Sequence, residues 1–168
     1  MIGLLVQIIT FPGIIFDQFS NKLACDLLEV KVHEVKYLQS EAPISYIIHD
    51  IPESYFKIFS LSIIPFMIST LTAILLFTIG YSFGEESIIF FIFCWLGISV
   101  AAHAFPNKKN GSLLWQKSIS EVKAGNYIAL LGFPLVVIIY LAQILHYVWL
   151  DIIYGFILLM LVVEPFFK

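Results

Sequence analysis

Two small groups of polar side chains, far apart in the sequence, have the types and spacing that metal binding would need. The first group is Asp17, Gln18 and Asn21. Residues 17 and 21 are four apart, so on a helix they share one face and offer two ligands to one metal ion. The second group follows a long apolar run and contains His103 and Asn110. Folding must bring the two groups together if they serve one site.

The elements that must position these groups are apolar segments. The chain has 168 residues, of which 60% are hydrophobic and 12% charged. A soluble domain carries about twice that share of charge, and a helix needs about 20 apolar residues to cross a bilayer. We therefore predict that most of the chain crosses a membrane, with the last two spans forming an antiparallel hairpin. The predicted spans are residues 2–16 (continuing as helix to 28), 58–79, 88–105, 127–147 and 149–166.

The lysines predict the orientation of these spans. All nine positive charges are lysines, and the five spans place every one of them on the same side, Lys168 after the fifth span included. The opposite side carries Glu85, Glu86 and Asp151. Because basic residues stay on the cytoplasmic side, we predict an integral membrane protein with its N-terminus outside and its C-terminus in the cytoplasm. Both polar groups then lie at the cytoplasmic ends of spans, at one membrane depth.

The pattern becomes extended between the first two spans. Residues 30–37 combine valines with charged side chains, and residues 44–49 form a second apolar run, as in two short strands. We predict a β-hairpin at about 30–49 on the membrane surface, where pairing satisfies the strand backbones. The predicted fold is one all-α membrane domain, residues 1–168, with this small hairpin.

One segment resembles a known family. Pro12–Asn21 reads Pro-Gly-Ile-Ile-Phe-Asp-Gln-Phe-Ser-Asn. It is similar to Pro-Gly-x-x-x-His-Glu-x-x-His, which begins the first core helix of small membrane zinc metalloproteases related to the site-2 proteases. The resemblance covers about residues 11–115. Its most specific part is His-Ala-Phe-Pro at 103–106, and it also includes residues 23–25, 46–52, 64–68 and 95–99.

The resemblance implies a metal site with altered residues. In such proteins two histidines bind zinc, the glutamate activates water, and an acidic residue after His-Ala-Phe-Pro can complete the site. The corresponding positions are Asp17 and Asn21 for the histidines, Gln18 for the base and Asn110 for the acid, with His103 in the family segment. Amide oxygens are poor zinc ligands, and glutamine cannot take a proton from water. We therefore expect no bound cofactor and no peptide hydrolysis; the alternative is one divalent metal ion, zinc in the ancestral form.

Three functions stay open at this point. The first is a proteolytically inactive protein that binds a membrane protein or an extended peptide segment. The second is an active intramembrane-type metalloprotease in which oxygen ligands hold a different metal and a group such as His49 replaces the base. The third is a structural subunit of a membrane complex, with the polar residues merely solvating helix ends. Deliberate inactivation of a metalloprotease would give the same four replacements. The bilayer is the expected partner in each case, and the sequence has no nucleic-acid motif.

Overall fold

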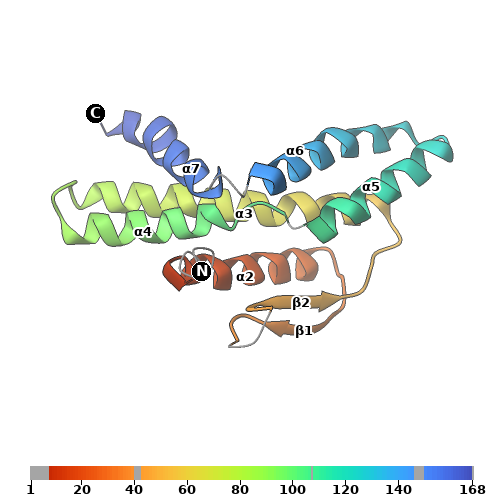
Figure 1. Ribbon diagram of the computed structural model, residues 1–168, viewed down its shortest axis with the longest axis horizontal. Coiled ribbons are helices and arrows are strands. Elements are labelled where there is room, and N and C mark those ends of the chain that lie inside the picture. Colours follow the sequence, from red (N-terminus) through yellow and green to blue (C-terminus); the bar gives the residue numbers. More distant parts are fainter. Residues whose placement is uncertain (1–7, 40–42, 107, 146–149, 168) are drawn as a thin grey trace.

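The computed structural model describes residues 8–39, 43–106, 108–145 and 150–167, and it is mostly helical with one two-stranded antiparallel sheet (Figure 1). The predicted combination of helices and one small hairpin is therefore confirmed. Three predicted features lie partly outside the described residues. These are the start of the first span, the tip of the hairpin and the connection between the last two spans.

Helix α2 (Phe11–Leu27) carries the first polar group. Pro12 lies in its first turn, where the missing N–H has no helical partner to lose and the fixed φ suits a helix. At the other end, Glu29 has a φ of 52°, and the Val30 N–H donates to the Cys25 carbonyl oxygen at 2.8 Å. This left-handed turn is a Schellman motif. It ends the helix close to the residue at which the sequence predicts its end.

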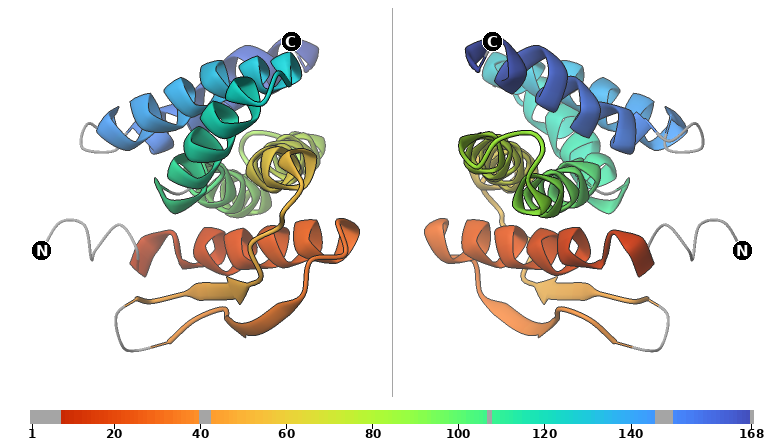
Figure 2. Two further views of the ribbon diagram at one scale, coloured as in Figure 1. Left: turned by 90° about the vertical axis from the view of Figure 1, so that its right-hand side faces the viewer. Right: turned by 90° about the vertical axis from the view of Figure 1, so that its left-hand side faces the viewer.

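The hairpin follows directly and is built from β1 (Val32–Lys36) and β2 (Tyr46–His49). The strands pair antiparallel, with an irregularity between Val32 and Glu34. Val30, Val32 and Ile47 pack against Ala24 and Cys25 of α2, so the apolar face of the sheet covers the helix. Figures 1 and 2 show β2 next to α2 and β1 on the outer side of the molecule. The predicted hairpin at 30–49 is confirmed.

Two long antiparallel helices form the centre of the fold, α3 (Tyr55–Ser82) and α4 (Ile88–Ala102), and α2 lies across both of them (Figures 1 and 2). Gly97 lets the ring of Phe77 lie against the backbone of α4, because a methyl group at Gly97 would overlap that ring. The predicted span at 88–105 extends three residues beyond α4. The helix ends at the cap residue His103, ahead of the segment that leads into the proline at 106.

A second antiparallel pair consists of α5 (Lys108–Lys123) and α6 (Gly132–Leu145), joined by the short 3-10 helix η1 (Tyr127–Leu131). The contact between this pair and α3 is apolar: Leu114 and Val136 are buried against Ile58, Tyr55 and Phe59. The α5–α6 pair therefore covers the first half of α3.

The last element is α7 (Leu150–Ile157), which continues as a π-helical segment η3 (Leu158–Val163) and a 3-10 turn η4 (Glu164–Phe166). Gly155 permits a close approach to α4, since a methyl group placed there would lie 3.3 Å from the Ile98 Cα. The main core cluster joins this segment to α3 and α4, with Leu158 and Val163 among its buried members.

The run from α6 to α7 lies along α3, and its chain direction is the same as that of α3. Taken from the start of α3 to its end, the contacts join Ile58 to Val136, Thr70 to Tyr154 and Tyr81 to Phe167. The predicted antiparallel hairpin of the last two spans is therefore wrong. The apolar face of α7 is buried against α4 instead of α6, and the two helices meet near their ends and diverge (Figure 1).

Length and composition identify fewer spanning helices than the five predicted. Among the described residues, α3 is the one helix long and apolar enough to cross a membrane, with 28 residues and a mean hydropathy of 2.1. Two further apolar helices, at Ile88–Ala102 and Tyr127–Leu141, are shorter.

Candidate functional site

The Pro-Gly pair at the start of α2 fixes the distance between this helix and α4. A methyl group at Gly13 would overlap the carbonyl oxygen of Ser99 and would lie 2.7 Å from the His103 ring. Only a residue without a side chain allows the two backbones to approach so closely. Gly13 therefore positions α2, and with it Asp17 one turn further along.

The carboxylate of Asp17 is held by two amide side chains of the same helix. Gln18 Nε2 donates to Asp17 Oδ2 at 2.9 Å. Asn21 Nδ2 donates to Asp17 Oδ1 and to the Asp17 main-chain oxygen, both at 2.8 Å. Gln18 and Asn21 thus supply the side-chain hydrogen bonds that hold the Asp17 carboxylate.

Burial changes the acidity of this group. It raises the pKa of the Asp17 carboxyl from 3.8 to about 7, against the hydrogen bond from Asn21, which lowers it. Removal from water disfavours the charged form, and a donated N–H favours it. The carboxyl therefore changes charge close to neutral pH.

Three of the four predicted ligand positions line one small cavity. Asp17 and Asn21 of α2 and Asn110 of α5 surround a volume of about 30 Å³, which is room for a water molecule or a single ion. The rest of the lining comes from α3 and from the segment after α4. These residues are Leu61, Ser62, Pro65, Ala104, Phe105 and Pro106. The structure thus brings Asp17 and Asn21 next to Asn110, which lies about 90 residues away in the sequence.

The proline inside α3 removes a helical hydrogen-bond donor next to this cavity. Pro65 has no N–H, so the carbonyl of Leu61, one turn earlier, lacks its usual helical donor. Both residues line the cavity. The polar lining residues Asp17, Asn21 and Asn110 all carry side-chain oxygen atoms. Such a set suits a hard cation or water better than zinc.

The fourth predicted ligand, His103, caps the end of α4 and contacts the start of α2, away from this cavity. Its Nε2 is 2.9 Å from Thr10 Oγ1, and Thr10 precedes Asp17 by seven residues, which is about 10 Å along a helix. His103 is not among the described residues that line the cavity. Within the described part of the chain, no group of three or more His, Cys, Asp or Glu side chains could hold a metal ion.

Gln18 connects the polar site to the hairpin. Its Nε2 also donates to Ser45 Oγ, just ahead of β2, at 3.2 Å. The side chain is 7% exposed, and its Oε1 has no hydrogen-bond partner among the described residues. The predicted position of the general base therefore faces the hairpin, and it is not among the described residues that line the cavity.

His49, at the end of β2, lies at a second cavity that adjoins the first. It lines this cavity of about 20 Å³, which shares Leu61, Ser62 and Asn110 with the first. Its Nδ1 donates to the Asp50 carbonyl oxygen at 2.7 Å. His49 is thus next to the polar site, although it is not among the described residues that line the Asp17 cavity.

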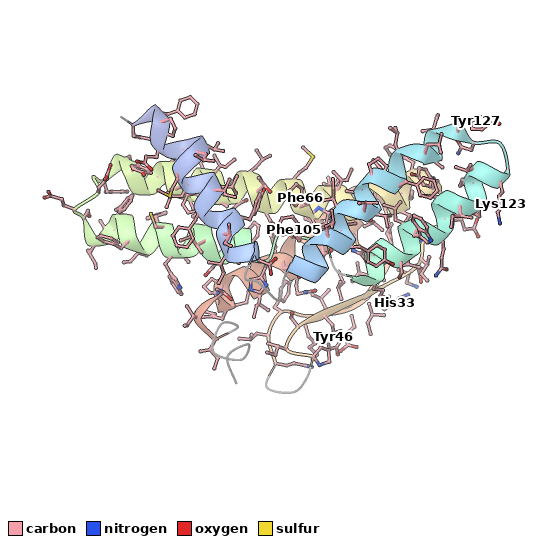
Figure 3. All side chains as sticks on the ribbon, turned by 45° about the horizontal axis from the view of Figure 1, so that its top comes forward. His33, Tyr46, Phe66, Phe105, Lys123 and Tyr127 are labelled. Atoms are coloured by element: carbon pink, nitrogen blue, oxygen red, sulfur yellow. The ribbon has the colours of Figure 1, made fainter. Side chains whose placement is uncertain are left out.

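Sequence reasoning missed the aromatic support of the site. Phe105, which lines the cavity, packs between Phe66 of α3 and Tyr154 of α7, at ring-centroid distances of 5.6 and 5.0 Å. Figure 3 shows Phe66 and Phe105 together where these elements meet. The family-like segment pointed to Phe105. Nothing local marked Tyr154, because its contact depends on how α7 packs.

Comparisons with protein-family models, with curated proteins and with solved structures each found no match.

Proposed function

We propose that this chain is an integral membrane protein in which α3, α4 and the α6–α7 run cross the bilayer. Large apolar side chains are exposed along all three, which a protein surrounded by water would avoid. Examples are Leu71 on α3, Phe91 on α4 and Leu161 after α7, at 62%, 58% and 72% exposure. Lipid contact accounts for such a surface.

The charges support one orientation. Lys57 lies in the first turn of α3, and Lys117 and Lys123 lie on α5 near the same end, whereas Glu85 and Glu86 occupy the turn between α3 and α4. Basic residues favour the cytoplasmic side, so the α3–α4 turn is outside.

Phe167 stacks on Tyr81 with 5.0 Å between the ring centroids, so the described C-terminal end lies beside the end of α3. This contact bears on the side of the membrane at which the C-terminus lies. It favours an outer C-terminus over the cytoplasmic one expected from sequence. The N-terminus stays predicted outside, which adds the predicted span at residues 2–16 to these three crossings.

The function that the site supports best is binding without cleavage: a divergent, site-2-protease-like protein that holds an extended segment of a membrane or peptide partner. The observation that carries this proposal is the hydrogen-bond network around Asp17. Gln18 and Asn21 direct amide N–H groups at the carboxylate. Those donors satisfy the acid without a metal, and neither can act as a base.

The hairpin provides the surface for the partner. Among the described residues, β1 pairs with β2 on one side only, and it lies on the outer side of the molecule (Figures 1 and 2). An open strand edge offers main-chain donors and acceptors to an added strand. The Gln18–Ser45 hydrogen bond joins this hairpin to the former catalytic helix.

Metal content tests the loss of catalysis. The wild-type protein, purified in a neutral detergent and measured by mass spectrometry, is expected to hold no stoichiometric zinc. A variant with Asp17→His, Gln18→Glu, Asn21→His and Asn110→Asp is expected to bind one zinc ion. Stoichiometric metal in the wild type that is lost in Asn110→Ala and in Asp17→Ala would contradict the proposal that the protein is proteolytically inactive.

Photocrosslinking tests the binding surface. A photoreactive side chain at Lys36, on the exposed face of β1, should form adducts with one reproducible partner segment in native membranes. The same group at Glu86, in the α3–α4 turn, is the matched control. Equal adducts at both positions, or none at Lys36, would contradict strand addition at the hairpin.

A second candidate is an active enzyme with a hard cation in place of zinc. The observation that favours it is the shared cavity of Asp17, Asn21 and Asn110, with its oxygen acceptors and room for one ion. Peptide hydrolysis by the purified wild type that depends on added Mg²⁺ or Mn²⁺ would support this candidate over the first.

A further inference from the structure

A cavity of about 550 Å³ lies at the opposite end of the α3–α5 contact from the polar site. This volume is within the range of about 300–1,000 Å³ that small-molecule sites occupy. The cavity forms where the start of α3 meets the end of α5 and η1. Figure 3 shows Lys123 and Tyr127 at this end of the molecule.

The wall of this cavity is fixed by close packing. The Tyr55 hydroxyl donates to the Ala129 carbonyl oxygen at 3.2 Å, which ties η1 to α3. A methyl group at Gly132 would overlap the Tyr55 and Ser118 hydroxyl oxygens. The rings of Tyr55 and Phe59 lie 6.1 Å apart and are tilted by 33°. The aromatic side of the cavity is therefore formed before any ligand binds.

Two carboxylates give the cavity its charge. Glu53 and Glu121 both line it, and no lysine is among its described lining residues. Glu121 is held in place by Asn126 at 3.1 Å and by Lys117 at 3.2 Å. The hydrogen bonds from Asn126 and Lys117 lower the pKa of Glu121, so it stays ionised at neutral pH. Lys117 balances the charge of Glu121, so the net charge of the lining comes from Glu53, which attracts a cation and disfavours a phosphate.

The outer part of the cavity is apolar. Phe56, Ile128 and Leu131 line it and are 70%, 71% and 64% exposed. An ion alone would leave these side chains uncovered. An alkyl chain would cover them.

We propose that this cavity binds an amphiphile with a single ammonium head and one alkyl chain. The head lies between Glu53 and Glu121 and against the faces of Tyr55 and Phe59, where carboxylates and aromatic rings both attract a cation. The chain lies along Phe56, Ile128 and Leu131. This site is separate from the partner surface on the hairpin, and the proposal does not depend on the proposed function.

The head-group preference is the test. The full-length protein in a neutral detergent is titrated with dodecylammonium, dodecanol and dodecyl phosphate, and bound ligand is counted by native mass spectrometry. Saturable binding of one dodecylammonium, at least tenfold tighter than the other two probes, is expected. Equal binding of all three, or tighter binding of the phosphate, would overturn the proposal.

Variants locate the site. Glu121→Gln and Glu53→Gln should each weaken dodecylammonium binding about tenfold, whereas Glu85→Gln, in the exposed α3–α4 turn, should not change it. Glu121 also forms a hydrogen bond with Asn126 and an ion pair with Lys117, so its substitution could act through these contacts. A variant that fills the cavity therefore provides a second measurement. Leu131→Trp, at an exposed position, should reduce binding of the ammonium probe without unfolding the protein. Unchanged binding in all three cavity variants would also overturn the proposal.

Discussion

Asp17 is a half-buried acid whose two neighbours on α2, Gln18 and Asn21, are neutral amides. Gln18 and Asn21 each donate one hydrogen bond to the Asp17 carboxylate. A hydrogen bond to a charged group is worth about 1.5–3 kcal/mol. Amide donors therefore suit a lone half-buried acid, whereas a second carboxylate at position 18 would repel it.

The raised pKa of Asp17 predicts a specific pH dependence. A group whose pKa rises on folding stabilises the fold below its unfolded value, here 3.8, and loses that contribution as the pH rises through its folded value of about 7. Relative to Asp17→Asn, the wild type should therefore lose up to about 4 kcal/mol of unfolding free energy between pH 4 and pH 8.

Thermal unfolding of both proteins in detergent with a chelator, at several pH values, measures this difference. Asp26→Asn, on the exposed face of the same helix, is the control and should follow the wild type. Parallel curves for the wild type and Asp17→Asn would show that Asp17 keeps an ordinary pKa in the folded protein.

Gly13 predicts a destabilising substitution that helix propensity alone would not. Alanine is favoured over glycine inside a helix by about 1 kcal/mol. At Gly13, however, the added methyl group would overlap the Ser99 carbonyl oxygen of α4. Gly13→Ala should therefore lower the free energy of unfolding by about 1–3 kcal/mol, the usual cost of overpacking.

The melting temperature in detergent measures this effect. Asp26→Ala removes an exposed side chain of α2 whose ion pair with Lys22 contributes little, so it should leave the melting temperature nearly unchanged. A rise in melting temperature for Gly13→Ala would mean that α2 and α4 are further apart than in the structure.

At the scale of elements, the end of α2 determines how the hairpin meets the helix. Glu29 adopts a φ of 52°, and the Val30 side chain then packs on Ala24 and Cys25. A residue with a side chain pays about 1–2 kcal/mol for the left-handed conformation. The chain adopts it because the turn places the apolar face of the strands against α2.

This strain predicts a stabilising substitution. Glu29→Gly should raise the free energy of unfolding by about 1 kcal/mol, because glycine adopts the left-handed conformation at no steric cost. Glu29→Ala keeps the strain and should give no gain, which separates backbone relief from the loss of charge. Chemical or thermal unfolding of the three proteins gives the comparison. Equal stability of the glycine and alanine variants would exclude the backbone explanation.

At the scale of the whole molecule, the direction of the last elements changes the expected sidedness. The run from α6 through α7 is parallel to α3, and Phe167 stacks on Tyr81 at the end of α3. A chain that crosses a membrane with this fold would have its described C-terminal end on the same side as the α3–α4 turn.

Sidedness can be measured by labelling single cysteines. Glu86→Cys and Phe166→Cys, both at exposed positions, should react with a membrane-impermeant maleimide from the same side, and Lys36→Cys from the opposite side. The native cysteines give little background, because both are buried and burial raises the pKa of Cys25 to about 11. Labelling of Phe166→Cys and Lys36→Cys from one side would contradict the parallel arrangement.

The sequence by itself determined the helices, the hairpin and which residues make up most of the candidate site. These are local properties: apolar runs favour helices, Pro12 starts α2, and the alternation after residue 30 favours strands. The family-like register also singled out Asp17, Asn21 and Asn110, which do line one cavity.

Only the tertiary structure decided how these pieces combine. His103 bonds Thr10 instead of facing Asp17, because Gly13 sets where α4 crosses α2. Tyr154 supports the site, and α7 runs parallel to α3, because α7 buries its apolar face on α4. A uniformly apolar sequence does not specify which neighbour a helix packs against. That choice depends on where small residues such as Gly13 and Gly155 let two backbones approach, and the approach is a property of both helices together.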